Sequence, residues 1–101
     1  MADLIIVYWR DIPAQVIVKK GRRDQVKRVL DDRFEKAIDR AAMRGKARST
    51  DDYLAEWRKA DPVAVSDDLA AEAESAAAEI ESAYDDARLA ELVENGGWAA
   101  A

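Results

Sequence analysis

The 101-residue sequence contains no cysteine and no histidine. Without cysteine there is no disulfide, no thiolate nucleophile and no cysteine metal site. Without histidine the chain lacks the commonest general base, the commonest metal ligand and the usual pH-sensitive side chain. The four serines are at positions 49, 66, 75 and 82, and none has a histidine to activate it. We therefore expect no catalytic residues, no metal site and no cofactor.

Long apolar runs are also missing. The first eleven residues, MADLIIVYWRD, have no basic region, and their apolar run is too short to cross a bilayer. We expect neither a signal peptide nor a membrane contact. Together with the lack of cysteine, this favours a cytoplasmic protein. The length favours one domain, placed at residues 1–97, with a short C-terminal tail at 98–101.

Charge is distributed unevenly along the chain. Residues 1–60 carry 15 basic against 10 acidic side chains, whereas residues 61–101 carry 1 against 11. The simpler interpretation is that the two halves fold together and leave their charged faces in water. The alternative is that the first half presents a basic surface to an anionic partner or ligand.

Residues 4–23, LIIVYWRDIPAQVIVKKGRR, predict an antiparallel β-hairpin. Two β-branched and aromatic runs flank RDIPA, whose proline is typical of a turn. Successive side chains of a strand alternate between faces, and both faces of residues 4–9 are apolar. The strand is therefore buried on both sides, or one side is covered by a partner subunit. We expect more apolar surface here than the helices of one small chain can cover.

The remaining sequence predicts helices. Apolar residues recur at helical spacing from Val26 to Ala41, which indicates a helix that begins at Arg22 or Arg23 and stops at Gly45. A second helix starts at Ser49 or Thr50 and ends before Pro62, and PVAVS suggests a third short strand near residues 63–65. Further helices are expected after Ser66 and after Asp85 or Asp86, with Trp98 docked on the body. The predicted fold class is α+β, with the hairpin packed against three to four helices.

The hairpin turn supplies the first candidate site. Asp11 can bond backbone N–H groups of the turn, and Arg10 can pair with Asp11 or lie along Tyr8, which would make both residues structural. The functional alternative is a contact edge in which Trp9 is the anchor and Arg10 a bidentate donor beside Asp11.

The basic segment 19–28 supplies the second candidate site, through Lys19, Lys20, Arg22 and Arg23, followed by Lys27 and Arg28. Such a run is usually a solvated face. Near a helix N-terminus it could hold a phosphate or a polyglutamate tail. Nucleic acid is disfavoured as a partner because the chain is acidic overall and no aromatic residues interleave with the run. The paired aspartates elsewhere mostly fall at predicted helix starts, where capping explains them.

Four segments, in this order and spacing, carry a family resemblance: IIVYWRDIPAQVIVKKGR, RFEKAIDRAAMRG, DDYLAEWRK and PVAVSDDLAAEA. They resemble the bacterial virulence factor domain family over nearly all of the chain, from Leu4 to about Gly97. The resemblance implies an accessory module whose stand-alone members are encoded near folate- and corrinoid-linked one-carbon enzymes. It implies no catalytic residues.

Three functions follow from these observations. The leading hypothesis is a non-enzymatic module that docks on another protein, namely a one-carbon enzyme. The second is a carrier of an anionic small molecule, or a small enzyme subunit, that uses Arg10 with Lys19, Lys20, Arg22 and Arg23. The third is a self-associating structural protein, a homodimer whose hairpin edges pair across a two-fold axis.

Overall fold

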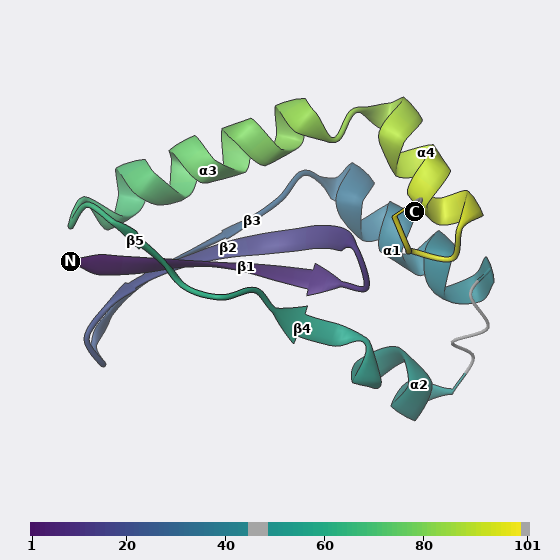
Figure 1. The fold of residues 1–101 in the computed structure, drawn as a ribbon, viewed down its shortest axis with the longest axis horizontal. Helices are drawn as coiled ribbons and strands as arrows, with labels where there is room; N and C mark the ends of the chain where they lie inside the picture. The colour runs from purple at the N-terminus through teal and green to yellow at the C-terminus, as the bar shows by residue number, and fades with distance from the viewer. Residues whose placement is uncertain (45–48, 100–101) are drawn as a thin grey trace.

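A computed structural model describes residues 1–44 and 49–99 and confirms the α+β class. Its centre is a five-stranded antiparallel sheet in the order β3-β2-β1-β4, with β5 also paired to β1 (Figure 1). The strands are β1 (Ala2–Trp9), β2 (Ile12–Lys20), β3 (Asp24–Val29), β4 (Trp57–Lys59) and β5 (Val63–Val65). The predicted hairpin is β1–β2, and the predicted strand near 63–65 is β5.

Four helices complete the fold: α1 (Asp32–Arg44), α2 (Thr50–Ala55), α3 (Leu69–Ala83) and α4 (Asp86–Glu94). Ser49 caps α2 through a bond from the Asp52 N–H, and Asp85 caps α4, as the sequence predicts. The N-cap of α3 is Asp68 rather than the predicted Ser66. The Ser66 hydroxyl accepts the backbone N–H of Asp68, which lies before the first residue of the helix. The predicted stop of the first helix at Gly45 lies outside the described residues.

The prediction of a helix from Arg22 or Arg23 is wrong over its first part, which forms β3. Val26 pairs with Val18, and Arg28 pairs with Val16, so this segment extends the sheet along β2. The apolar residues that suggested one helical stripe belong to two elements. Val26 faces the core from the sheet, whereas Phe34 and Ile38 face it from α1. The gain in strand pairing outweighs the helical spacing of the side chains.

The second predicted helix is also shorter than expected, because α2 ends at Ala55 and not near Pro62. Trp57 begins β4 and pairs with Trp9, which gives the second edge of β1 hydrogen-bonding partners. An unpaired central strand would leave its backbone groups unsatisfied. The backbone hydrogen bonds between β4 and β1 therefore outweigh the helical spacing of Tyr53 and Trp57.

The main core lies between the sheet and the helices. α3 packs mainly on β2 and β3, whereas α1 and α4 pack on each other near the β1–β2 turn (Figure 1). Ala73 and Ala77 are the buried residues of α3, and their small side chains let the helix approach the sheet closely. Trp9 and Phe34 are the largest fully buried side chains of this core.

The other face of the hairpin has a small core of its own. Ile5, Val7 and Ile17 form it with Trp57 packed against them, and their exposed fractions are 7%, 8% and 7%. The single chain therefore buries this face of β1, whereas Leu4 and Ile6 on the opposite face are only partly buried. Part of the apolar surface of the hairpin stays accessible there. None of the helices in the described ranges has the length and apolarity needed to span a bilayer.

Candidate functional site

The tip of the β1–β2 hairpin is a structural clamp built around Arg10. Arg10 has a φ of 54°, a conformation that the first position of a two-residue hairpin turn normally reserves for glycine. Its guanidinium lies between the Trp9 and Trp98 rings, 4.8 and 5.2 Å from their centroids. Nη1 donates to the Gly96 carbonyl at 2.6 Å, and Nη2 is 3.6 Å from Glu56. The side chain offsets the backbone strain by tying three segments together.

Asp11 joins the same turn to the end of the chain and to β4. Its backbone N–H donates to the Gly97 carbonyl at 2.8 Å, and its carboxylate accepts the Ala99 N–H at 2.7 Å. The other carboxylate oxygen is 3.2 Å from Nη2 of Arg58. The expected pair of Arg10 with Asp11 is thus replaced by Arg10 with Glu56 and Arg58 with Asp11. Trp98 is only half docked, with 47% of its surface exposed.

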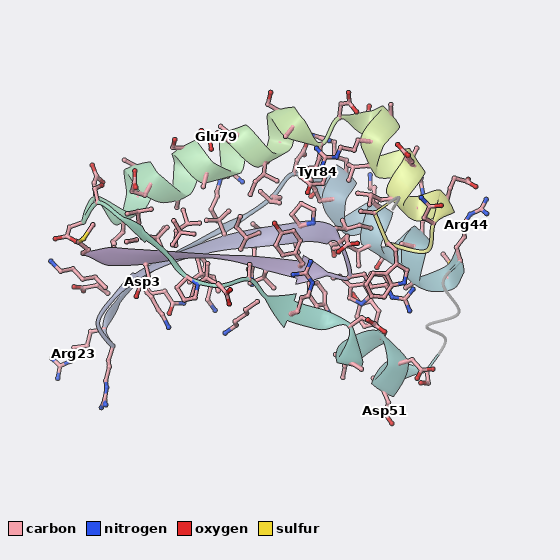
Figure 2. All side chains as sticks on the ribbon, in the orientation of Figure 1. Asp3, Arg23, Arg44, Asp51, Glu79 and Tyr84 are labelled. Carbon is pink, nitrogen blue, oxygen red and sulfur yellow. The ribbon has the colours of Figure 1, made fainter. Side chains whose placement is uncertain are left out.

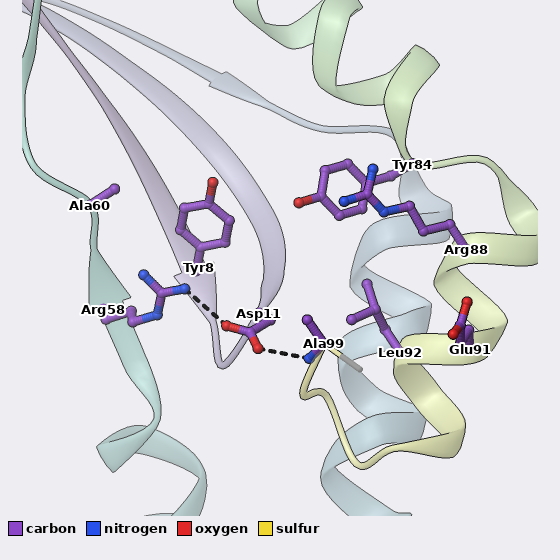
Figure 3. A pocket seen from close by; sticks show the side chains of 9 residues that line it. All are labelled: Tyr8, Asp11, Arg58, Ala60, Tyr84, Arg88, Glu91, Leu92 and Ala99. Atoms are coloured by element: carbon purple, nitrogen blue, oxygen red, sulfur yellow. Dashed lines mark hydrogen bonds and ion pairs between the residues drawn. The ribbon is translucent and has the colours of Figure 1, made fainter. Parts of the chain in front are cut away.

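A pocket of about 480 Å³ opens beside this clamp, between β1–β4 on one side and the α3–α4 corner on the other (Figure 3). Tyr8 and Tyr84 line it from these opposite sides, and each carries an arginine on its ring. We call it the tyrosine–arginine pocket. Its lining residues are Tyr8, Asp11, Arg58, Ala60, Tyr84, Arg88, Glu91, Leu92 and Ala99.

Each arginine of the pocket is held in place by the adjacent tyrosine. Arg58 lies 4.4 Å from the centre of the Tyr8 ring, as expected for residues directly opposite on β1 and β4. Arg88 lies 4.0 Å from the centre of the Tyr84 ring and donates to the Ala83 carbonyl at 3.1 Å. Burial, followed by the nearby Tyr84, raises the pKa of Tyr8 above its ordinary value. The Tyr8 phenol therefore stays protonated at neutral pH and can donate a hydrogen bond.

A separate, predominantly apolar groove of about 280 Å³ lies over the N-terminal part of β1. Because α3 packs mainly on β2 and β3, the part of this sheet face over β1 has little helix above it. Side chains alternate along a strand, so Leu4 and Ile6 lie on the same face as Tyr8. We call this surface the β1 groove. Its apolar lining residues are Leu4, Ile6, Val63, Val65, Ala76 and Ile80, and its polar lining residues are Glu72, Ser75 and Glu79 of α3.

The basic segment 19–28 begins at the opposite end of the sheet, where Arg23 lies far from Tyr84 (Figure 2), and runs back along β3 to Arg28. Arg22 and Arg23 are in the exposed turn between β2 and β3, and no helix begins there. Lys20 is bound to Asp67 at 2.8 Å, a hydrogen bond that lowers the pKa of Asp67 and raises that of Lys20. Arg28 pairs with Glu74 at 2.8 Å. Two of the six basic residues of the segment, Lys20 and Arg28, are therefore paired with acidic side chains of the chain itself.

Arg10 cannot share a site with that basic segment. The two are separated by the length of β2, nine residues, which at about 3.3 Å per residue is roughly 27 Å. Of the predicted site residues, the structure brings Trp9, Arg10 and Asp11 together at the turn and leaves Lys19, Lys20, Arg22 and Arg23 at the far end. Only Asp11 lines the tyrosine–arginine pocket.

The main polar residues of the pocket come from separate parts of the chain. Tyr8, Arg58, Tyr84 and Arg88 belong to β1, β4, the end of α3 and α4. Sequence reasoning missed them as a group because no spacing connects them. Across residues 1–44 and 49–99, no cluster of three or more carboxylates that could hold a metal ion is found. The pocket offers cations, phenols and carboxylates for binding.

Comparison with known proteins gives a family. A family model described as "Virulence factor" matches residues 7–93, so the chain belongs to the virulence factor family. The match covers every strand except most of β1 and every helix except the last residue of α4. No curated protein and no solved structure matches the chain.

Proposed function

We propose that this member of the virulence factor family is a non-enzymatic accessory module that docks on another protein through the β1 groove. We further propose that the partner is a folate- or corrinoid-linked one-carbon enzyme. The observation that carries the docking proposal is the open part of the sheet over β1. There a predominantly apolar groove lies over β1, and a separate pocket nearer the C-terminal end of the strand is lined by two tyrosines and two arginines.

These residue types suit a protein interface. Tyrosine and arginine are enriched among the residues that dominate binding energy, and they act best beside apolar surface that excludes water. The groove is floored by Leu4 and Ile6 of β1 and bordered by Val63, whose side chain is 58% exposed. An extended segment of the partner, placed along β1, would cover Val63 and bring its end to the tyrosine–arginine pocket.

A binding role also agrees with the chemistry of the pocket. Asp11 is held by Arg58 and by the Ala99 N–H, so its two oxygens are already engaged. With no cysteine or histidine in the chain, the phenols and guanidinium groups have no partner that would activate a nucleophile. These groups are suited to hold a ligand in place rather than to transform it.

Replacing Val63 by aspartate is expected to reduce recovery of the partner about tenfold or more, because a carboxylate would be buried in an apolar contact. The measurement is affinity purification of tagged protein from the native host, with the recovered proteins identified by mass spectrometry. Val29→Asp is the matched control, because Val29 is 63% exposed on β3, outside the β1 groove. That control should recover the partner as wild type does.

The proposal has two parts, which the same purification separates. Recovery of a one-carbon enzyme by wild type and Val29→Asp but not by Val63→Asp supports both. Recovery of a different enzyme that also depends on Val63 supports the docking surface but contradicts the one-carbon assignment. Recovery of the chain alone contradicts docking and favours the self-associating alternative.

A further inference from the structure

The two arginines of the tyrosine–arginine pocket differ in their pairing. Arg58 is bound to Asp11 at 3.2 Å, whereas Arg88 makes no ion pair with any described residue. Arg88 is nevertheless oriented, since it stacks on Tyr84 and donates one N–H to the Ala83 carbonyl. A stacked guanidinium with remaining N–H groups is a ready donor to a planar oxyanion.

The charges around Arg88 favour an oxyanion of low charge. Two arginines and two acidic residues, Asp11 and Glu91, line the pocket, so its formal charges balance. A phosphate monoester would bring a charge of about −1.5 to −2 next to those two carboxylates. A carboxylate brings a single charge, so it can pair with Arg88 at a smaller cost in repulsion from Asp11 and Glu91.

The tyrosines supply the remaining contacts. Their rings lie on opposite sides of the pocket (Figure 3), each with an arginine over one face. The raised pKa of Tyr8 keeps its hydroxyl protonated and able to donate a hydrogen bond. The volume of about 480 Å³ falls within the usual range for small-molecule sites. A ligand that combines an aromatic or other flat apolar group with one carboxylate would use every group described.

We propose that the tyrosine–arginine pocket binds a single carboxylate attached to a flat apolar group, with Arg88 as its ion-pair donor and Tyr8 and Tyr84 as its walls. The proposal deepens the proposed function, since it specifies what the docked segment presents beyond the β1 groove. The carboxylate can belong to that segment or to a free small acid, and the chemistry of recognition is the same.

The test uses the isolated protein and 3-phenylpropionate, followed by amide chemical shifts in two-dimensional NMR. We expect a Kd on the order of 1 mM, as is usual for a fragment of this size, with shifts at Tyr8, Tyr84 and Arg88. The neutral 3-phenylpropionamide should bind at least about tenfold more weakly, and phenyl phosphate should also bind more weakly.

Arg88→Gln should weaken 3-phenylpropionate binding about tenfold, and Arg88→Lys should weaken it less, because lysine keeps the charge but loses the planar fork. The matched control is Arg40→Gln, an exposed arginine on α1 outside this pocket, which should bind as wild type does. Equal affinity for the acid and the amide, tighter binding of phenyl phosphate, or unchanged binding by Arg88→Gln would overturn the proposal. So would the absence of any shift at 20 times the expected Kd.

The source of the carboxylate is tested with a six-residue peptide. Valine occupies every second position before the last residue, which is a phenylalanine with a free carboxylate. If the docked segment carries the carboxylate, the peptide binds at least about tenfold more tightly than 3-phenylpropionate, and Val63→Asp removes that gain. If the ligand is a free small acid, the peptide gains nothing over the fragment. Fragment binding does not need the partner, so loss of partner recovery with intact fragment binding would reject only the docking proposal.

Discussion

Trp9→Ala is expected to lower the free energy of unfolding by about 3–5 kcal/mol, the range for removing a large aromatic side chain from a core. Trp9 is fully buried, stacks on Tyr53 with ring centroids 5.7 Å apart, and donates from Nε1 to the Tyr53 carbonyl at 2.9 Å. It also lies under Arg10 at the turn. The substitution therefore removes packing, a hydrogen bond and the base of the Arg10 clamp together.

Urea denaturation followed by circular dichroism measures this effect. Trp98→Ala is the matched control, because Trp98 touches the other side of the same arginine but is 47% exposed. That control should cost less than about 1 kcal/mol, since Trp98 lies at the surface with 47% of its area already in solvent. Similar losses for the two variants would contradict the placement of Trp9 at the centre of the fold.

Gly97→Ala is expected to cost about 2–5 kcal/mol. Gly97 has a φ of 97°, and an added Cβ would lie 2.9 Å from Cζ3 of Trp9 and 3.2 Å from Cδ of Arg10. Strain of a positive φ adds about 1–2 kcal/mol, and overpacking adds about 1–3 kcal/mol. Both clashing groups are held by the clamp, so neither side chain can give way cheaply.

Gly21→Ala separates the two causes of that loss. Gly21 has a φ of 67°, but nothing lies within 4 Å of an added Cβ, so only backbone strain of about 1 kcal/mol remains. Thermal unfolding of both variants should therefore show a clearly larger decrease in Tm for Gly97→Ala. Equal decreases would mean that the C-terminal segment does not pack against Trp9 and Arg10.

The hairpin and β5 could be predicted from sequence because their signals are local. β-branched and aromatic runs are sufficient to mark the hairpin of residues 4–20, and the α+β class follows from helical spacing elsewhere. The turn was misplaced, because Pro13 lies inside β2 opposite Tyr8, at a register shift, and the turn is at Arg10 and Asp11. The final helix was also marked locally, by Asp85 at its N-cap. Each of these signals depends on neighbours in the chain rather than on neighbours in space.

β3 and β4 could not be predicted because each depends on hydrogen bonding to another strand of the sheet. β3 pairs with the edge of β2, and β4 pairs with β1, which is remote in the sequence. Val26, Val29 and Leu30 are spaced as in a helix, and β3 alternates weakly because charged residues occupy both of its faces. The one local signal was the pair Asp31 and Asp32, which stands at the start of α1 and marks the end of the preceding strand. Trp57 carries no strand signal until its pairing with Trp9 is known.

The tyrosine–arginine pocket was beyond sequence reasoning for the same reason. Arg10 and Asp11 were predicted as partners because they are adjacent, yet adjacent residues in a tight turn point in different directions. Arg58 takes the place beside Asp11 and Tyr8 that was assigned to Arg10. The basic segment attracted attention by its charge density, but Asp67 and Glu74 partly neutralise it in the fold.

The central claim is that the open groove over β1 is the docking surface. Its most direct test replaces Val63, Val29 or Arg23, one at a time, with a photoreactive amino acid in the native host. Irradiation and mass spectrometry then identify the crosslinked protein at each position. We expect a one-carbon enzyme to be crosslinked from position 63 and not from position 29 or 23. Crosslinks to a partner from position 29 or 23 with none from 63, or crosslinks only to a second copy of the chain, would contradict it.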